Sequence, residues 1–208
     1  MLLKVLFTIM MVMCVSAYNI TTTVGTKPTT VTTLDVNKYT GLWYQMYADQ
    51  IVYSTFEKDA YCSTAKYGLN EDGTISVHNY ATIGSPTGTT YIIDGYAYNT
   101  DPSQPGQLKV HFDSDKAAPF DAPYWVLALG PVNNNQYDWA VVSDNLSQFL
   151  FILARDVATF KSTYEAEVLQ LVDTLGFTGL KKPIATYQGS DCVYEATLRQ
   201  NYIKSHSN

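Results

Sequence analysis

The chain has 208 residues, of which 46% are hydrophobic and 15% are charged, and its formal net charge is −6. This length suits one globular domain with a single core and is short for two. The acidic balance argues against nucleic acid and anionic membranes as partners, because an acidic surface repels both.

The N-terminal segment has the features of a secretory signal. Lys4 places a positive charge ahead of an apolar run from Val5 to Val15, and Val15-Ser16-Ala17 offers small residues for cleavage after Ala17. We therefore expect residues 1–17 to be a signal peptide and the protein to be secreted and extracellular. The run is shorter than the roughly 20 apolar residues of a membrane span, which makes an uncleaved anchor the weaker alternative.

The cysteines and sequons fit an exported protein. Cys14 lies within the signal, so cleavage leaves Cys62 and Cys192. In an oxidising compartment such a pair predicts a disulfide, with two free thiols as the alternative. Asn145 and Asn19 each begin an Asn-x-Ser/Thr sequon and are candidate glycosylation sites.

Composition divides the rest of the chain into three parts. Residues 18–34 are rich in threonine and have no apolar period, which predicts a flexible lead-in outside the core. From Asp35 on, the sequence consists of short apolar or alternating runs separated by turn residues. We expect the folded domain to cover residues 35–192 and a polar tail to cover residues 193–208.

Eight segments have the length and alternation of β-strands. The turn at Asn70-Glu71-Asp72-Gly73 ends in a glycine, and the segment Asp101–Gly106 contains two prolines, which donate no backbone hydrogen bond. Short antiparallel strands with evenly spaced turns predict a sandwich or a closed up-and-down barrel. The predicted strands cover residues 43–50, 61–69, 74–83, 89–99, 107–112, 124–129, 137–143 and 149–154.

After the last predicted strand the apolar period changes from 2 to 3.6. This predicts one amphipathic helix that packs against the outside of the barrel, with Gly176 at its C-terminal cap. The extended piece Pro183–Tyr187 is expected to pair with the first strand before the tail brings Cys192 to Cys62. The helical stripe consists of Phe160, Tyr164, Val168, Leu171, Val172 and Leu175.

Two short runs are placed to meet at one end of a closed barrel. Gly41-Leu42-Trp43-Tyr44 opens the first strand, and Ile152-Leu153-Ala154-Arg155 closes the eighth. There the Arg155 guanidinium would lie across the Trp43 indole, an interaction worth about 0.5 to 2 kcal/mol. This closure would leave the other end open, so we expect a cup for an apolar molecule.

Together with Thr55-Phe56-Glu57 and the run Ala122–Ala128, these segments resemble the lipocalin superfamily, in particular the group of apolipoprotein D and the bacterial outer-membrane lipocalins. The resemblance covers residues 35–192. It implies an all-β fold, an eight-stranded antiparallel up-and-down β-barrel with one C-terminal amphipathic α-helix packed outside. It also implies binding and transport of a small hydrophobic ligand, such as a fatty acid, sterol or retinoid, in the barrel cavity.

Alternation along the strands predicts which side chains line that cavity. If Arg155 points into the closed end, Phe151 and Phe149 lie on its side of the strand. Tyr67 and Asn79 match positions that resemble pocket positions of the family. The predicted ligand-binding residues are Tyr67, Asn79, Val110, Phe112, Tyr137, Trp139, Phe149 and Phe151, with plain core filling as the alternative for each. Gly41, Trp43 and Arg155 are predicted to be structural.

The chain offers no signal for catalysis. Its three histidines, His78, His111 and His206, are scattered, and no metal-binding or hydrolase motif occurs. We therefore expect no enzymatic activity, no metal site and no cofactor, with a lipocalin-type enzyme as the weaker alternative.

A different class of function is contact with a lipid surface, a lipoprotein or a receptor through loops at the barrel mouth. Ile51, Val52 and Tyr53, in the first long loop, are the apolar candidates for such contact. The same residues would equally serve as a lid over the cavity.

Overall fold

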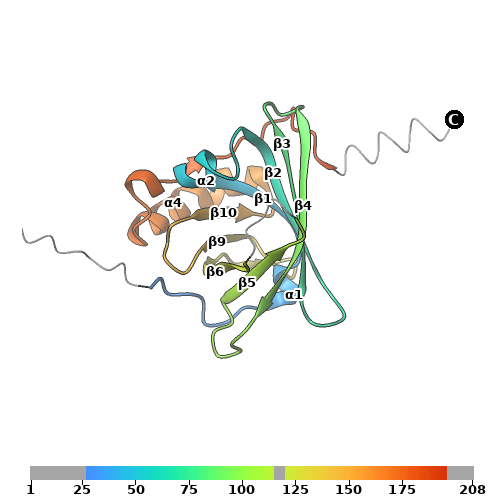
Figure 1. The fold of residues 1–208 in the computed structure, drawn as a ribbon. Helices are drawn as coiled ribbons and strands as arrows, with labels where there is room; N and C mark the ends of the chain where they lie inside the picture. The colour runs from blue at the N-terminus through green and yellow to red at the C-terminus, as the bar shows by residue number, and fades with distance from the viewer. Residues whose placement is uncertain (1–26, 115–119, 196–208) are drawn as a thin grey trace, which may run out of the picture.

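The computed structural model describes residues 27–114 and 120–195, so the expected signal peptide, the Asn19 sequon and most of the predicted tail lie outside the described residues. Within these ranges, eight antiparallel strands close into a barrel because β1 pairs with both β2 and β10 (Figure 1). The predicted up-and-down barrel is thereby confirmed. The strands are β1 (Gly41–Ala48), β2 (Ala60–Leu69), β3 (Ile75–Ile83), β4 (Thr89–Asn99), β5 (Gln107–Phe112), β6 (Ala122–Leu129), β9 (Trp139–Ser143) and β10 (Leu150–Ala154).

Three short strands lie outside the ring or between its members. The hairpin of β7 (Val132–Asn133) and β8 (Gln136–Tyr137) fills the connection from β6 to β9. The strand β11 (Ile184–Ala185) pairs antiparallel with the end of β1, which confirms the pairing expected for the extended piece after the helix.

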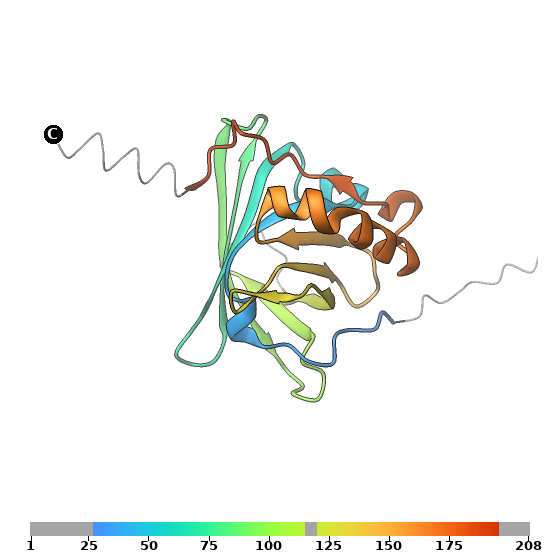
Figure 2. The same ribbon diagram turned by 180° about the vertical axis from the view of Figure 1, so that it is seen from behind.

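The predicted helix packs against the outside of the barrel (Figure 2). It begins with α3 (Val157–Thr159), passes through a π-helical turn, η1 (Phe160–Tyr164), and continues as α4 (Glu165–Thr174). Gly176, with φ +86°, ends it as predicted and lets the Phe177 N–H return to the Val172 carbonyl at 3.0 Å. Phe177 is therefore buried, whereas Leu175, expected in the apolar stripe, is 38% exposed.

Apolar side chains form two separate cores, one inside the barrel and one between the barrel and the helix. Alternation on β10 supplies both: Leu153 points inward, and Leu150 and Ile152 point outward beneath the helix. The outer core also receives Phe160, Val168 and Val172 from the helical stripe.

The described part of the threonine-rich segment belongs to the fold. Thr30 is buried, Val31 and Leu34 pack against the inner core, and the Val31 N–H bonds the Val126 carbonyl at 3.0 Å. The prediction of a flexible lead-in is wrong for Lys27–Leu34, because this stretch covers apolar surface at one end of the barrel.

The closed end of the barrel is organised by Arg155. Its guanidinium carbon lies 3.5 Å from the centroid of the buried Trp43 ring, which confirms the predicted contact. Its side chain also donates four hydrogen bonds to backbone carbonyls, three of them in or beside α1 (Val36–Tyr39) and β1. The acceptors are Leu42 at 2.7 Å, Lys38 at 3.0 Å, Tyr39 at 3.1 Å and Tyr137 at 3.2 Å.

Gly41 is required at this closure for two reasons. Its φ of +99° is rarely adopted by residues with a side chain, and a Cβ here would lie 2.7 Å from Gln136 Nε2 and 3.2 Å from an Arg155 nitrogen. The backbone of β1 can therefore approach the Arg155 guanidinium closely only because residue 41 has no side chain.

On the mouth side, the C-terminal segment closes a gap between β1 and β2. These strands pair only from Gly41 to Tyr44, and above that point the side-chain amide of Gln188 bridges the Gln45 and Ser63 carbonyls at 2.9 and 2.8 Å. The disulfide between Cys62 and Cys192 fixes the same segment, with Cα atoms 5.6 Å apart, and confirms the predicted pairing.

Two short helices complete the described elements, α2 (Gln50–Ser54) at the mouth and the 3₁₀ turn η2 (Gly179–Lys181) in contact with it. In the described part of the chain, no helix is both long and apolar enough to cross a membrane.

Candidate ligand-binding site

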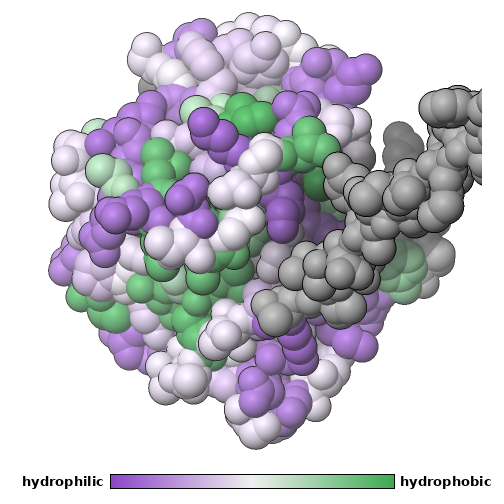
Figure 3. All heavy atoms as spheres, turned by 90° about the vertical axis from the view of Figure 1, so that its left-hand side faces the viewer, coloured by the Kyte–Doolittle hydropathy of each residue, from purple (hydrophilic) through white to green (hydrophobic). Residues whose placement is uncertain are grey.

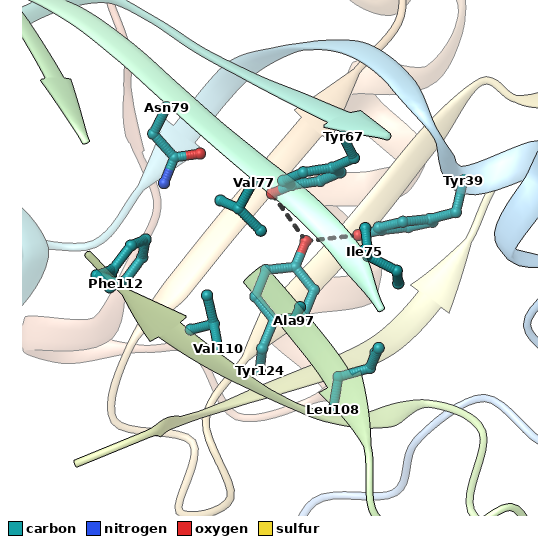
Figure 4. A pocket seen from close by; sticks show the side chains of 10 residues that line it. All are labelled: Tyr39, Tyr67, Ile75, Val77, Asn79, Ala97, Leu108, Val110, Phe112 and Tyr124. Atoms are coloured by element: carbon teal, nitrogen blue, oxygen red, sulfur yellow. Dashed lines mark hydrogen bonds between the residues drawn. The ribbon is translucent and has the colours of Figure 1, made fainter. Parts of the chain in front are cut away.

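A cavity of about 40 Å³ lies inside the barrel, between the closed end and the middle of the strands (Figure 4). Its walls come from α1, β2, β3, β4, β5 and β6, and none of the lining side chains carries a charge. The lining residues are Tyr39, Tyr67, Ile75, Val77, Asn79, Ala97, Leu108, Val110, Phe112 and Tyr124.

The structure places four of the predicted ligand-binding residues at this cavity: Tyr67, Asn79, Val110 and Phe112. Tyr67 comes from β2 and Asn79 from β3, while Val110 and Phe112 lie on the inward face of β5. Alternation predicts the inward side of these strands well because their other face carries polar residues such as Lys109 and His111.

The prediction for Trp139 is wrong. Its side chain lies in the outer core, and Ala140 and Val142 point into the barrel instead. Tyr137 and Trp139 do not share one continuous strand, since Tyr137 belongs to β8 and β9 starts at Trp139. All five residues of β9 are buried, so its sequence has no polar alternation that would reveal which face is inside.

Three further predicted residues lie away from the cavity walls. The Tyr137 hydroxyl accepts a hydrogen bond from the Asp35 N–H at 3.1 Å, and its carbonyl accepts one from Arg155, so Tyr137 belongs to the closed end. Phe151 packs on the inner core nearer the mouth. Phe149, at the mouth, contacts Phe56 with ring centroids 5.5 Å apart.

Two tyrosines that sequence reasoning missed complete the polar part of the cavity. The Tyr124 hydroxyl lies 2.7 Å from the Tyr39 hydroxyl and 3.2 Å from the Tyr67 hydroxyl (Figure 4). We call Tyr39, Tyr67 and Tyr124 the tyrosine triad. Burial raises the pKa of Tyr67 to about 12 and also raises the pKa values of Tyr39 and Tyr124. All three phenols are therefore protonated at physiological pH.

Asn79 presents an unsatisfied polar atom to the same cavity. Its Oδ1 is buried and has no hydrogen-bond partner among the described residues. Leaving such an acceptor unpaired costs about 1 to 3 kcal/mol. A bound molecule that donates a hydrogen bond at this point would recover part of that cost.

The mouth is formed by the connections β1–β2, β3–β4, β5–β6 and β9–β10. Three of them expose a large apolar side chain: Phe56 is 57%, Phe120 68% and Leu146 60% exposed. Figure 3 views the molecule from the side on which α2 and α4 lie in Figure 1, and hydrophobic residues are visible there among hydrophilic ones.

The mouth-loop residues expected from the sequence are less exposed than these three. Val52 is fully buried, Ile51 is partly buried, and the Tyr53 hydroxyl lies 2.6 Å from the hydroxyl of Thr186. The expectation that Val52 contacts a lipid surface or partner is therefore wrong, because α2 places this side chain in the interior.

A carboxyl group lies in the mouth loop without a cationic partner among the described residues. Glu57 Oε2 accepts a hydrogen bond from Gln45 Nε2 at 2.6 Å. Burial raises the pKa of Glu57 to about 7, and the bond from Gln45 opposes this shift only in part. Elsewhere in the described ranges, no group of three or more His, Cys, Asp or Glu residues has the geometry to hold a metal ion.

Comparison with known proteins agrees with this architecture. A family model, the lipocalin-like domain, matches residues 34–182. Temperature-induced lipocalin-1 of Arabidopsis thaliana is 32% identical over 145 residues, which cover 67% of this chain and 73% of that protein. Apolipoprotein D of Rattus norvegicus is 38% identical over 94 residues, 45% of either chain.

The fold is also that of japanin from Rhipicephalus appendiculatus, solved in a complex with cholesterol. The TM-score is 0.53 at 14% identity, and the match covers 77% of this chain and all of the other. A closed eight-stranded barrel with an outer helix, together with the family match over residues 34–182, shows that the chain belongs to the lipocalin family.

The partly buried carboxyl of Glu57 predicts a specific pH dependence of stability. Because the pKa of Glu57 rises from 4.5 to about 7 on folding, the folded protein holds this proton more tightly than the unfolded chain. The stabilisation is complete below pH 4.5 and is lost as the pH rises toward 7. In Glu57→Gln this loss should disappear, so the variant should gain up to about 3 kcal/mol relative to wild type across that window.

Urea unfolding of both proteins at pH 4.5, 5.5, 6.5 and 7.5 measures this difference. Asp35→Asn is a suitable control, because the hydrogen bond from Lys38 lowers the pKa of that carboxyl. Asp35 therefore titrates below this pH range, and the difference between Asp35→Asn and wild type should stay nearly constant across it. A constant difference between Glu57→Gln and wild type over the whole range would contradict the assignment.

Proposed function

We propose that the protein binds and carries a small hydrophobic ligand inside the barrel, and that the ligand enters from the mouth. The observation that supports this most directly is an interior cavity with an uncharged, mostly apolar lining above a sealed floor. Membership of the lipocalin family and the cholesterol complex of japanin are consistent with it. Tyr67, Asn79, Val110 and Phe112 are the proposed contact residues, with Phe151 above them.

Ligand entry requires side chains to move. Ligand pockets commonly measure about 300 to 1,000 Å³, and the cavity measures about 40 Å³. Phe112 is the lining residue at the mouth end of β5 and is only partly buried, so turning its ring outward would join the cavity to the mouth. We infer that binding selects or induces this wider state.

Affinity would come from apolar area. A ligand that loses about 300 Å² of apolar surface gains roughly 7 kcal/mol at about 25 cal/mol per Å². Ordering the ligand and opening the cavity reduce this gain, which leaves room for micromolar binding.

We further propose that the protein acts outside the cell. The disulfide between Cys62 and Cys192 supports this setting, because such bridges persist in oxidising compartments. Asn145, at the β9–β10 turn, is a proposed glycosylation site there.

The exposed mouth residues support a second candidate function, contact with an uncharged lipid surface. Phe56, Phe120 and Leu146 come from three different connections at the same end of the barrel. Apolar side chains gathered at one end are suited to dip into a lipid layer, and a ligand could then pass between the layer and the cavity.

Filling the cavity should remove ligand binding. Ala97→Leu adds three carbon atoms to a buried wall of the cavity, and we expect affinity for an uncharged fluorescent lipid probe to fall at least tenfold. The matched control is Ala166→Leu, at an exposed position of α4. Titration of the two variants measures the effect, and native mass spectrometry of the secreted protein identifies any ligand that co-purifies. Equal affinities for the probe in wild type, variant and control would place binding outside the barrel.

The lipid-surface function predicts a separate loss. Wild type should co-sediment with phosphatidylcholine vesicles, and Phe56→Ser/Leu146→Ser should reduce the bound fraction at least fivefold because two apolar contacts are removed. The control, Leu42→Ser/Leu69→Ser, changes exposed leucines at the closed end. If wild type stays in the supernatant, or if both double variants lose binding alike, the mouth is not the contact surface.

A further inference from the structure

The hydrogen bonds of the tyrosine triad leave one proton without an acceptor. Three phenol groups carry three O–H protons, but the chain of contacts from Tyr39 through Tyr124 to Tyr67 contains two hydrogen bonds. Each bond uses one proton, whichever hydroxyl donates. Whatever the direction of the bonds, one O–H of the triad remains available within the described residues.

The groups of the triad also keep their protons. Burial raises the pKa of Tyr67 to about 12, and it raises the pKa values of Tyr39 and Tyr124 as well. The count of three protons therefore holds across the physiological pH range.

Asn79 adds the complementary group. Figure 4 shows its amide and the hydroxyl of Tyr67 facing the cavity on either side of Val77. In the strand register Tyr67 lies opposite Val77, and Asn79 is the next inward residue toward the mouth. The cavity thus presents a surplus donor from the triad and a vacant acceptor, Asn79 Oδ1, within one apolar space.

The charge of the site restricts the ligand further. The lining contains no lysine, arginine or histidine. Arg155, the cation of the closed end, is held by four backbone carbonyls and the face of Trp43. A carboxylate bound beside the triad would therefore lose its hydration and gain only attraction at a distance from Arg155, with no cation in the lining to pair with it directly.

We propose that the ligand of this cavity is an uncharged amphiphile whose hydroxyl group lies between the triad and Asn79. The hydroxyl oxygen accepts the surplus tyrosine proton, and the hydroxyl hydrogen is donated to Asn79 Oδ1. An alkane leaves both protein groups unpaired, and an ether satisfies only the triad. This inference rests on the proposed carrier function and narrows its ligand class to alcohols.

A ligand series matched in chain length tests the proposal. The probes are decane, 1-decanol, its methyl ether and decanoate at pH 7.5, each measured by displacement of the fluorescent probe from wild type and two variants. Asn79→Leu removes the acceptor at similar volume, and Tyr39→Phe/Tyr67→Phe/Tyr124→Phe removes all three hydroxyls, and with them the surplus proton, while it keeps the three rings. Tyr96→Phe, at an exposed tyrosine, is the control.

We expect Asn79→Leu to lower the affinity for 1-decanol three- to tenfold. Its affinities for decane and for the ether should change less than twofold. Tyr39→Phe/Tyr67→Phe/Tyr124→Phe should weaken the binding of both 1-decanol and the ether by a similar factor and leave the binding of decane unchanged. Decanoate should bind wild type at least tenfold more weakly than 1-decanol. Thermal unfolding of each variant verifies that it is folded. The ratio of the affinities of wild type for 1-decanol and decanoate tests the proposal without any variant.

The possible failures are distinguishable. If both variants change the affinities for decane and 1-decanol by the same factor, or if decanoate binds as tightly as 1-decanol, no ligand hydroxyl lies between the triad and Asn79. The carrier function still stands in that case. If the probe and the whole series fail to bind wild type, the carrier function itself is contradicted.

Discussion

The contact between Arg155 and Trp43 is the constraint on which the rest of the structure depends. One guanidinium joins the end of β10 to the start of β1, the end of α1 and the β8 residue Tyr137. The Tyr39 carbonyl accepts from both Arg155 and the Trp43 indole, the latter at 2.8 Å. Burial lowers the pKa of Arg155 only to about 10, so it stays charged at physiological pH. Because α1 is fixed in this way, Tyr39 is positioned to form the floor of the cavity.

This closure makes the two ends of the barrel different in kind. At the floor, short contacts converge on Arg155, and the segment Lys27–Leu34 covers adjacent apolar surface. At the mouth, β1 and β2 separate, the disulfide-linked C-terminal segment fills the gap, and apolar side chains remain exposed. The helix adds a second apolar core outside the ring, so part of the packing that stabilises the domain lies outside the barrel interior.

The sequence predicts most of the fold because its local signals are strong. Turn residues delimit the strands, the 3.6 period and Gly176 mark the helix, and Trp43 with Arg155 identifies the closure. It predicts the cavity less well. Trp139 was misplaced because a strand buried on both faces has no polar alternation. Tyr39 and Tyr124 were missed because they are 85 residues apart, and only the register of the closed barrel brings their hydroxyls together.

The central claim, that Arg155 holds the closed end together, is tested most directly by urea unfolding of Arg155→Lys. Lysine keeps the charge but cannot reproduce the planar fork that reaches several carbonyls while stacking on an indole. The account predicts a loss of about 2 to 4 kcal/mol in the free energy of unfolding, since several charge-assisted hydrogen bonds are lost together. A free energy of unfolding within about 0.5 kcal/mol of wild type, the range typical of neutral surface changes, would contradict it.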